Sequence, residues 1–198
     1  VYTREQLLKA CLIKSANDAA LALARDTAGS VPAFAQRMNA KARRLGATRS
    51  HFVNPHGLTA SGQYSTARDI ARIAYAASRN SFIRRTVNQE TYTFHTPRGP
   101  KHLKNTNKLL GRMGACTGMK TGYTRASGRC LVTSASLGRR SIILVQLGSE
   151  TKYIFDDAER LMIWSSSQRP RAHGSYAYTV LTEDSRTKPR PTDHAPHM

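Results

Sequence analysis

The sequence is poor in acidic residues and cysteine, and it lacks a long apolar run. Only 12 of its 198 residues are Asp or Glu, against 31 Lys or Arg, which gives a formal net charge of +19. No run approaches the ~18 apolar residues of a membrane span, and no N-terminal stretch has the pattern of a signal peptide. The chain begins at Val1 and not at Met, so we expect a mature or partial product. Any export signal or membrane anchor then belongs to segments outside this chain.

The three cysteines, Cys11, Cys116 and Cys130, form no C-x-x-C pair. An odd count without that spacing argues against a zinc site and against a full disulfide framework. Cys11 falls on the apolar side of an expected helix, which indicates a buried free thiol. The spacing does not place Cys116 opposite Cys130. We expect no metal and no cofactor.

The positive charge is spread through every segment and forms no single basic run. Such an excess favours a polyanionic partner, whether nucleic acid, anionic lipid or an acidic cell-wall polymer. A nucleic-acid-binding protein would join its basic patch to a recognisable motif. Zinc-finger spacing, RNP-type aromatic strings and heptad zippers are all missing from this sequence. We therefore expect no nucleic acid among the partners.

Helical patterns fill the first half of the chain. A capping box at Thr3 opens a helix that ends near Lys14, and two further helices are expected over residues 18–28 and 30–46. An irregular stretch over 51–64 precedes a helix that Ser65 or Thr66 caps.

The pattern changes to strands after residue 88. Strands are expected over 91–94, 119–123, 129–136 and 141–147, and a last helix over 156–165. This order predicts an α+β fold, in which an antiparallel sheet backed by the C-terminal helix lies beside a helical subdomain. Residues 1–167 form the expected domain, and the Pro-, Arg- and His-rich residues 168–198 are expected to be a disordered tail or linker.

Two short motifs could carry chemistry. Ser15-Ala16-Asn17 lies between the first two helices, and Lys120-Thr121-Gly122 lies on an expected strand. An S-x-N triplet occurs a second time at residues 78–80, so it is weak evidence alone. Composition predicts roughly 0.06 accidental K-T-G triplets, which makes that match more specific. Together with S-x-x-K, these motifs are the signature of penicillin-binding proteins and class A β-lactamases.

Longer blocks in the same order make the identification firmer. The chain resembles serine-type D-alanyl-D-alanine carboxypeptidases, the low-molecular-mass penicillin-binding proteins, from Tyr2 to about Trp164. The blocks that carry this resemblance are residues 2–8 (YTREQLL), 15–20 (SANDAA), 51–58 (HFVNPHGL), 64–69 (YSTARD), 105–110 (NTNKLL) and 118–124 (GMKTGYT).

The resemblance implies a β-lactamase/DD-peptidase-like fold and acyl transfer through a serine ester. Ser15 would relay a proton to the leaving D-alanine, and Asn17 would hydrogen-bond the substrate backbone. Lys120 would supply positive charge beside Ser15 and the substrate carboxylate. The implied substrate is a peptidoglycan stem peptide ending in D-Ala-D-Ala, and β-lactams would inhibit the complete protein. The implied location is the cell envelope, in the periplasm or on the outer face of the cytoplasmic membrane.

The residues after Lys120 would form the opposite wall of the substrate cleft. Thr121 would offer its hydroxyl to the substrate carboxylate, and Gly122 would let the substrate backbone approach closely. The N–H of Tyr123 would be one of two oxyanion donors.

The main departure from the family is the missing S-x-x-K, which should precede S-x-N. The pattern occurs only at residues 149–152 and 185–188, both after K-T-G and neither on a buried apolar helix. We therefore expect an N-terminally truncated chain that lacks the nucleophile, has an incomplete fold and is inactive alone. Phe155 stands where some relatives carry a carboxylate-binding Arg, a role that Lys152 could take.

Other interpretations remain open. Ser15 and Asn17 could simply cap the helix that starts at Asp18, and Lys120 could be a solvated residue on a sheet edge. A class A β-lactamase would need a general-base Glu, and Glu90 is the only Glu between the two motifs. A degenerate relative could instead bind the cell wall without catalysis, held by its positive charge.

Overall fold

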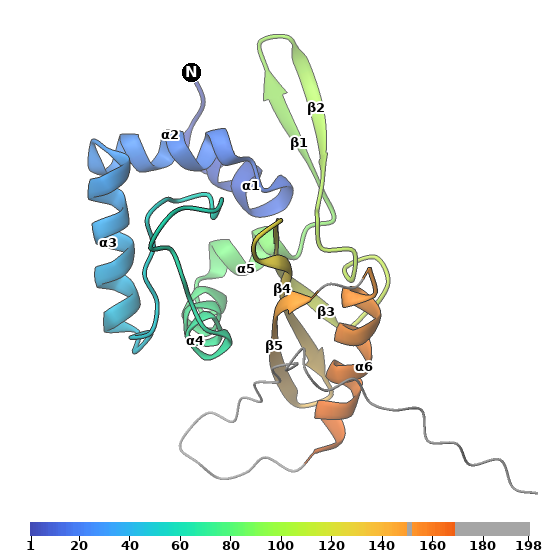
Figure 1. Ribbon diagram of the computed structural model, residues 1–198. Coiled ribbons are helices and arrows are strands. Elements are labelled where there is room, and N and C mark those ends of the chain that lie inside the picture. Colours follow the sequence, from blue (N-terminus) through green and yellow to red (C-terminus); the bar gives the residue numbers. More distant parts are fainter. Residues whose placement is uncertain (150–151, 169–198) are drawn as a thin grey trace, which may run out of the picture.

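The computed structural model describes residues 1–149 and 152–168, and it has an α+β architecture (Figure 1). This confirms the predicted fold class. Helices come first, antiparallel strands follow, and one helix closes the described part of the chain. The helices are α1 (Arg4–Lys14), α2 (Asn17–Ala28), α3 (Val31–Arg44), α4 (Ala67–Ser78), α5 (Ser81–Val87) and α6 (Ile154–Ser167). The strands are β1 (Thr91–Thr96), β2 (Gly99–Lys104), β3 (Cys116–Thr124), β4 (Gly128–Leu137) and β5 (Arg140–Ser149).

Side-chain caps fix the starts of the helices. Thr3 and Gln6 form the predicted capping box of α1, and Ser30 accepts from the backbone N–H of Ala33 at the start of α3. Thr66, and not Ser65, caps α4 by accepting from the N–H of Asp69. Each cap satisfies a backbone donor that has no partner within the helix.

The main sheet is a three-stranded antiparallel meander in the order β3-β4-β5. Alternation along β4 sends Leu131 towards α6 and Val132 towards α4, because successive side chains of a strand point to opposite faces. Met162 of α6 packs in the same buried cluster as Leu131. The sheet is therefore covered by the C-terminal helix on one face and by α4 of the helical part on the other, as Figure 1 shows.

The strand predicted over 91–94 belongs to a separate hairpin. β1 pairs only with β2 among the described strands, and this two-stranded ribbon projects away from the main sheet (Figure 1). β2 was not predicted, because its sequence GPKHLK has too few apolar residues to show alternation. The short helix α5 was also missed. Its seven residues make barely two turns, and they span too little chain for a helical period to stand out.

None of the three cysteines forms a disulfide. Cys116 is buried, whereas Cys11 and Cys130 are only half-buried, so the expectation of a buried Cys11 was too strong. Residues 169–198, nearly all of the expected tail, lie outside the described residues. Within the part that the structure describes, no helix is long and apolar enough to cross a membrane.

Candidate active site

Ser15 lies at the tight junction between α1 and α2. It ends α1 in the left-handed conformation, with φ 62° and ψ 40°, and it is the only non-glycine residue with positive φ in the described chain. An L-residue in this region carries about 1–2 kcal/mol of strain. Such strain is often found where a side chain must be held in one place.

The side chain of Ser15 is bonded to the K-T-G strand and does not cap a helix. Lys120 Nζ donates to Ser15 Oγ over 2.8 Å and to the carbonyl oxygen of Thr121 over 2.7 Å. The N-cap of α2 is Ala16, which makes no side-chain capping bond, and Asn17 is the first residue of the helix itself. The capping interpretation of Ser15 and Asn17 is therefore wrong. S-x-N and K-T-G come together as the motif signature predicts.

Lys120 is largely shielded from solvent, so the interpretation of it as a solvated residue on a sheet edge is wrong. Burial lowers the pKa of Lys120 to about 8, and the charge interaction with Cys11 acts in the opposite direction. Burial also raises the pKa of Cys11 to about 11, with Asp18 adding to this effect and Lys120 opposing it. At neutral pH Cys11 is therefore a neutral thiol. The pKa of the neighbouring Lys120 lies about one unit above neutral pH.

A cavity of about 420 Å³ opens beside this pair. Ser15, Thr121, Gly122 and Tyr123 all line it, so four of the six predicted site residues share one space. Lys120 is hydrogen-bonded to Ser15 at the wall of this cavity.

Asn17 is not among the residues that line the cavity. It is exposed and makes no side-chain hydrogen bond within the described chain. The basic residues Lys108, Arg129 and Lys152 also line the cavity, and no acidic residue does so in the described structure.

The Asn-Thr-Asn segment before β3 also belongs to this site. Sequence reasoning matched it to the family but gave it no role. Asn105 and Asn107 are buried, and their side chains hold the turn: Asn105 Oδ1 accepts from the N–H of Asn107, and Asn107 Oδ1 accepts from that of Leu109. Thr106, between them, lines the cavity and accepts a hydrogen bond from Thr121 Oγ1 over 2.7 Å.

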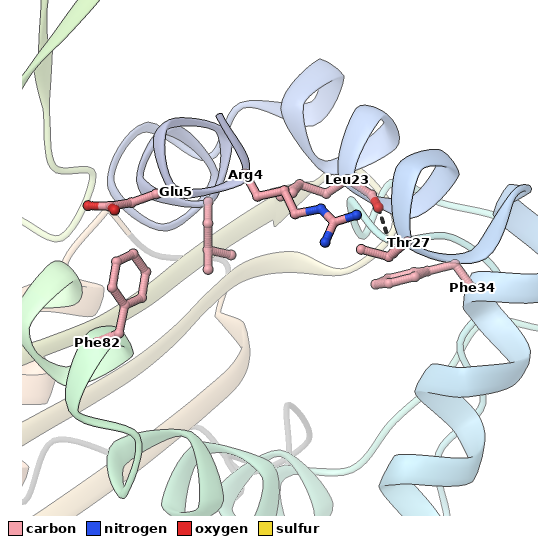
Figure 2. A pocket seen from close by; sticks show the side chains of 7 residues that line it. Arg4, Glu5, Leu23, Thr27, Phe34 and Phe82 are labelled. Carbon is pink, nitrogen blue, oxygen red and sulfur yellow. Dashed lines mark hydrogen bonds between the residues drawn. The ribbon is translucent and has the colours of Figure 1, made fainter. Parts of the chain in front are cut away.

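A second hollow, of about 490 Å³, lies between α1, α2, α3 and α5 (Figure 2). Phe34 and Phe82 extend into it from opposite sides. Its other lining residues are Leu8, Leu23, Arg4, Glu5 and Thr27. It contains neither Ser15 nor Lys120. Among the described residues, no group of His, Cys, Asp or Glu could hold a metal ion.

The two alternative S-x-x-K matches do not supply a complete motif in the described structure. Ser149 ends β5, and Lys152 lines the cavity, but residues 150–151 between them lie outside the description. The match at residues 185–188 lies wholly outside it.

Comparison with known proteins gives one family for most of the chain. The D-alanyl-D-alanine carboxypeptidase family matches residues 1–151. The chain is 40% identical over 161 residues to the carboxypeptidase DacC of Escherichia coli and 37% identical over 150 residues to DacF of Bacillus subtilis. These matches cover 80% and 75% of this chain but only 39% of each relative. The chain therefore spans about two fifths of the length of these curated relatives.

A solved structure gives the same result for the fold. The D-alanyl-D-alanine carboxypeptidase of Mycobacterium tuberculosis superposes with a TM-score of 0.81 and 33% identity, covering 86% of this chain and 66% of that one. A D-alanyl-D-alanine endopeptidase of Escherichia coli is 36% identical over 166 residues, covering 82% of this chain and 53% of that protein. With a family match over three quarters of its length and its motifs gathered around one cavity, the chain belongs to the D-alanyl-D-alanine carboxypeptidase family.

Proposed function

We propose that this chain supplies the S-x-N and K-T-G parts of a serine D-Ala-D-Ala carboxypeptidase. The complete enzyme removes the terminal D-alanine from peptidoglycan stem peptides. A serine oxygen attacks the carbonyl between the two D-alanines, D-alanine leaves, and water hydrolyses the resulting ester. The observation that carries the proposal is the hydrogen bond from Lys120 Nζ to Ser15 Oγ beside the cavity.

Ser15 and Lys120 are assigned to proton transfer and charge. The hydroxyl of Ser15 can pass a proton towards the leaving amine, because a hydroxyl both donates and accepts. Lys120 holds this hydroxyl in place and places a positive charge beside the substrate carboxylate. Asn17, two positions after Ser15 and first in α2, is exposed, and its amide, which has no hydrogen-bond partner among the described residues, can bond the substrate backbone.

The K-T-G strand is assigned to substrate binding. β3 pairs only with β4 among the described strands, so its other edge can accept an extended peptide as an added strand. Thr121 then offers its hydroxyl to the terminal carboxylate, Gly122 permits close approach, and the N–H of Tyr123 is an oxyanion donor. The basic residues of the cavity suit a ligand that ends in a carboxylate.

The nucleophile is assigned to chain outside residues 1–198. Neither S-x-x-K match stands in the family's motif order, and residues 1–198 are accordingly inactive by themselves. The complete protein acts in the cell envelope, where its substrate is found, and β-lactams acylate the S-x-x-K serine.

Release of D-alanine tests the proposal. The protein extended to include an S-x-x-K segment should release D-alanine from a peptide ending in D-Ala-D-Ala, and it should release no L-alanine from the counterpart ending in L-Ala-L-Ala. A cross-linked dimeric peptide separates carboxypeptidase from endopeptidase action. An extended, folded protein that releases no D-alanine from the peptide ending in D-Ala-D-Ala contradicts the proposal.

A further inference from the structure

The turn that carries Thr106 links the two halves of the site. The backbone N–H of Thr106 donates to the carbonyl oxygen of Ile13, two residues before Ser15, over 3.1 Å. Asn105 Nδ2 donates to the carbonyl oxygens of Val87 and Gln89, which ties the turn to the C-terminal end of α5 and the residues just after it. The position of Thr106 is therefore fixed by its own backbone and by buried neighbours, and the hydroxyl is not needed to hold the turn.

The hydroxyls of Thr106 and Thr121 form a pair that faces the cavity. Thr121 Oγ1 donates to Thr106 Oγ1 over 2.7 Å, and both residues line the cavity. Each hydroxyl has one hydrogen, so the pair uses one hydrogen internally. The other, on Thr106, has no acceptor in the described structure.

This arrangement has a consequence for the carboxylate-binding role of Thr121. Its only hydrogen is already committed to Thr106, so Thr121 alone has none left for a ligand. The two hydroxyls together still have one hydrogen available for a ligand, the hydrogen of Thr106. Either Thr106 donates it directly, or Thr106 donates to Thr121 and the Thr121 hydrogen turns to the ligand. In both cases a second hydroxyl strengthens the first, because hydrogen-bonded hydroxyls polarise one another.

We propose that Thr106 is a specificity-determining residue which, together with Thr121, forms a two-hydroxyl donor for the free carboxylate of the terminal D-alanine. This assignment rests on the proposed function. It makes the pair the element that distinguishes a peptide with a free carboxylate end from one whose end is blocked.

The test compares two substrates on the complete, active protein. One is a peptide ending in D-Ala-D-Ala, and the other is the same peptide with a C-terminal carboxamide. Thr106→Val keeps the shape and removes the hydroxyl. Without Thr106 Oγ1 the Thr121 hydrogen is free to turn to the ligand, so this variant loses the polarising second hydroxyl and keeps one donor. It should lower the ratio of kcat/KM for acid over amide about twofold to threefold, mainly through KM for the acid. Thr106→Ser should keep the wild-type ratio.

Thr117, which lies on β3 like Thr121, offers a matched control. Thr117 Oγ1 pairs with Ser134 Oγ over 2.7 Å, and neither residue lines the cavity. Thr117→Val should leave the acid-to-amide ratio unchanged. Thr106→Ala is the second variant should Thr106→Val melt early. Thr106→Val,Thr121→Val should lower the ratio about tenfold, well beyond either single variant, because each single variant keeps one hydroxyl hydrogen for the carboxylate and the double variant keeps none.

The outcomes separate the two proposals. A wild-type protein that releases no D-alanine overturns the proposed function, and the assignment of Thr106 with it. The assignment of Thr106 alone is overturned if the wild-type protein releases D-alanine and a folded Thr106→Val or Thr106→Ala variant keeps the wild-type acid-to-amide ratio of kcat/KM. A fall in the ratio that Thr106→Ser shares also counts against it, since serine retains the hydroxyl.

Discussion

Lys120 reaches across 105 positions of sequence to place its Nζ 2.8 Å from Oγ of Ser15. α1 and β3 are built from distant parts of the chain, and this bond joins them at the wall of the cavity. Ser15 is also held in a left-handed conformation that most residues avoid. These two observations support a functional role for the junction between α1 and α2.

Replacing Ser15 tests its role as a proton relay. In the complete protein, Ser15→Ala should lower turnover by about 10²–10⁴-fold while the melting temperature stays close to the wild type. Ser30→Ala is the matched control, because Ser30 is a true N-cap whose side chain accepts from Ala33. That variant should lose ~1 kcal/mol of stability and keep its turnover. Equal turnover in the two variants would remove Ser15 from the mechanism.

Substrate binding should depend on pH through Lys120. Its pKa of about 8 lies below the ordinary 10.5, so Lys120 loses its charge as pH rises through about 8. KM for the free-acid peptide should then rise between pH 7 and 9.5, while KM for the carboxamide peptide changes little. Between about pH 8 and 10.5 the unfolded chain binds more protons at this residue, so its contribution to the free energy of unfolding increases with pH. A flat KM profile for the acid contradicts the assignment of Lys120.

Gly118 fixes the approach of the K-T-G strand to α5. Its φ is +123°, and a Cβ there would lie 2.7 Å from Val87 Cγ2 and 2.8 Å from the Val87 carbonyl oxygen. Gly118→Ala should therefore cost ~3 kcal/mol of unfolding free energy, measured by urea denaturation. Gly114→Ala should cost less than ~0.5 kcal/mol, because nothing lies within 4 Å of the added carbon. Similar midpoints for the two variants would show that β3 is free to move.

Asp69 holds the segment that follows α3, at Arg49 and Ser50, against α4. Its side chain is fully buried and accepts from the N–H of Arg49, the hydroxyl of Ser50 and the guanidinium of Arg72. Asp69→Ala leaves the N–H of Arg49 without this acceptor, whereas Ser50 keeps Ser65 and Arg72 keeps the carbonyl oxygen of Gly46. The loss of the buried carboxylate should cost ~3 kcal/mol of unfolding free energy. Asp26→Ala, at an exposed ion pair, is the control and should leave the urea midpoint unchanged within error. A small effect of Asp69→Ala would contradict this account of the segment.

Local signals in the sequence were enough to predict the outline of the fold. The capping box at Thr3 and the cap at Ser30 act within one helical turn, so short stretches of sequence reveal them. The turn of Gly138 and Arg139 between β4 and β5 is local in the same way. β2 could not be predicted, because its pairing with β1, and not its own pattern, makes it a strand.

The candidate site was predictable only where a motif marked it. Ser15 and Lys120 stood in recognisable triplets, and the structure places them in contact. Thr106 had no such marker, because its relation to Thr121 depends on how the turn before β3 folds onto the end of α1. The lowered pKa of Lys120 was equally hidden, since burial arises only when the helical part packs against β3.

Labelling with a fluorescent penicillin tests the central claim most directly. The claim is that residues 1–198 hold the S-x-N and K-T-G halves of a penicillin-reactive site and not its nucleophile. Ser15 has no base to activate it here, because Lys120 donates to its oxygen. The account predicts no covalent label on residues 1–198 alone, and one label per molecule once an upstream S-x-x-K segment is joined. Mass spectrometry that finds a penicilloyl adduct on any serine of residues 1–198 alone would contradict it.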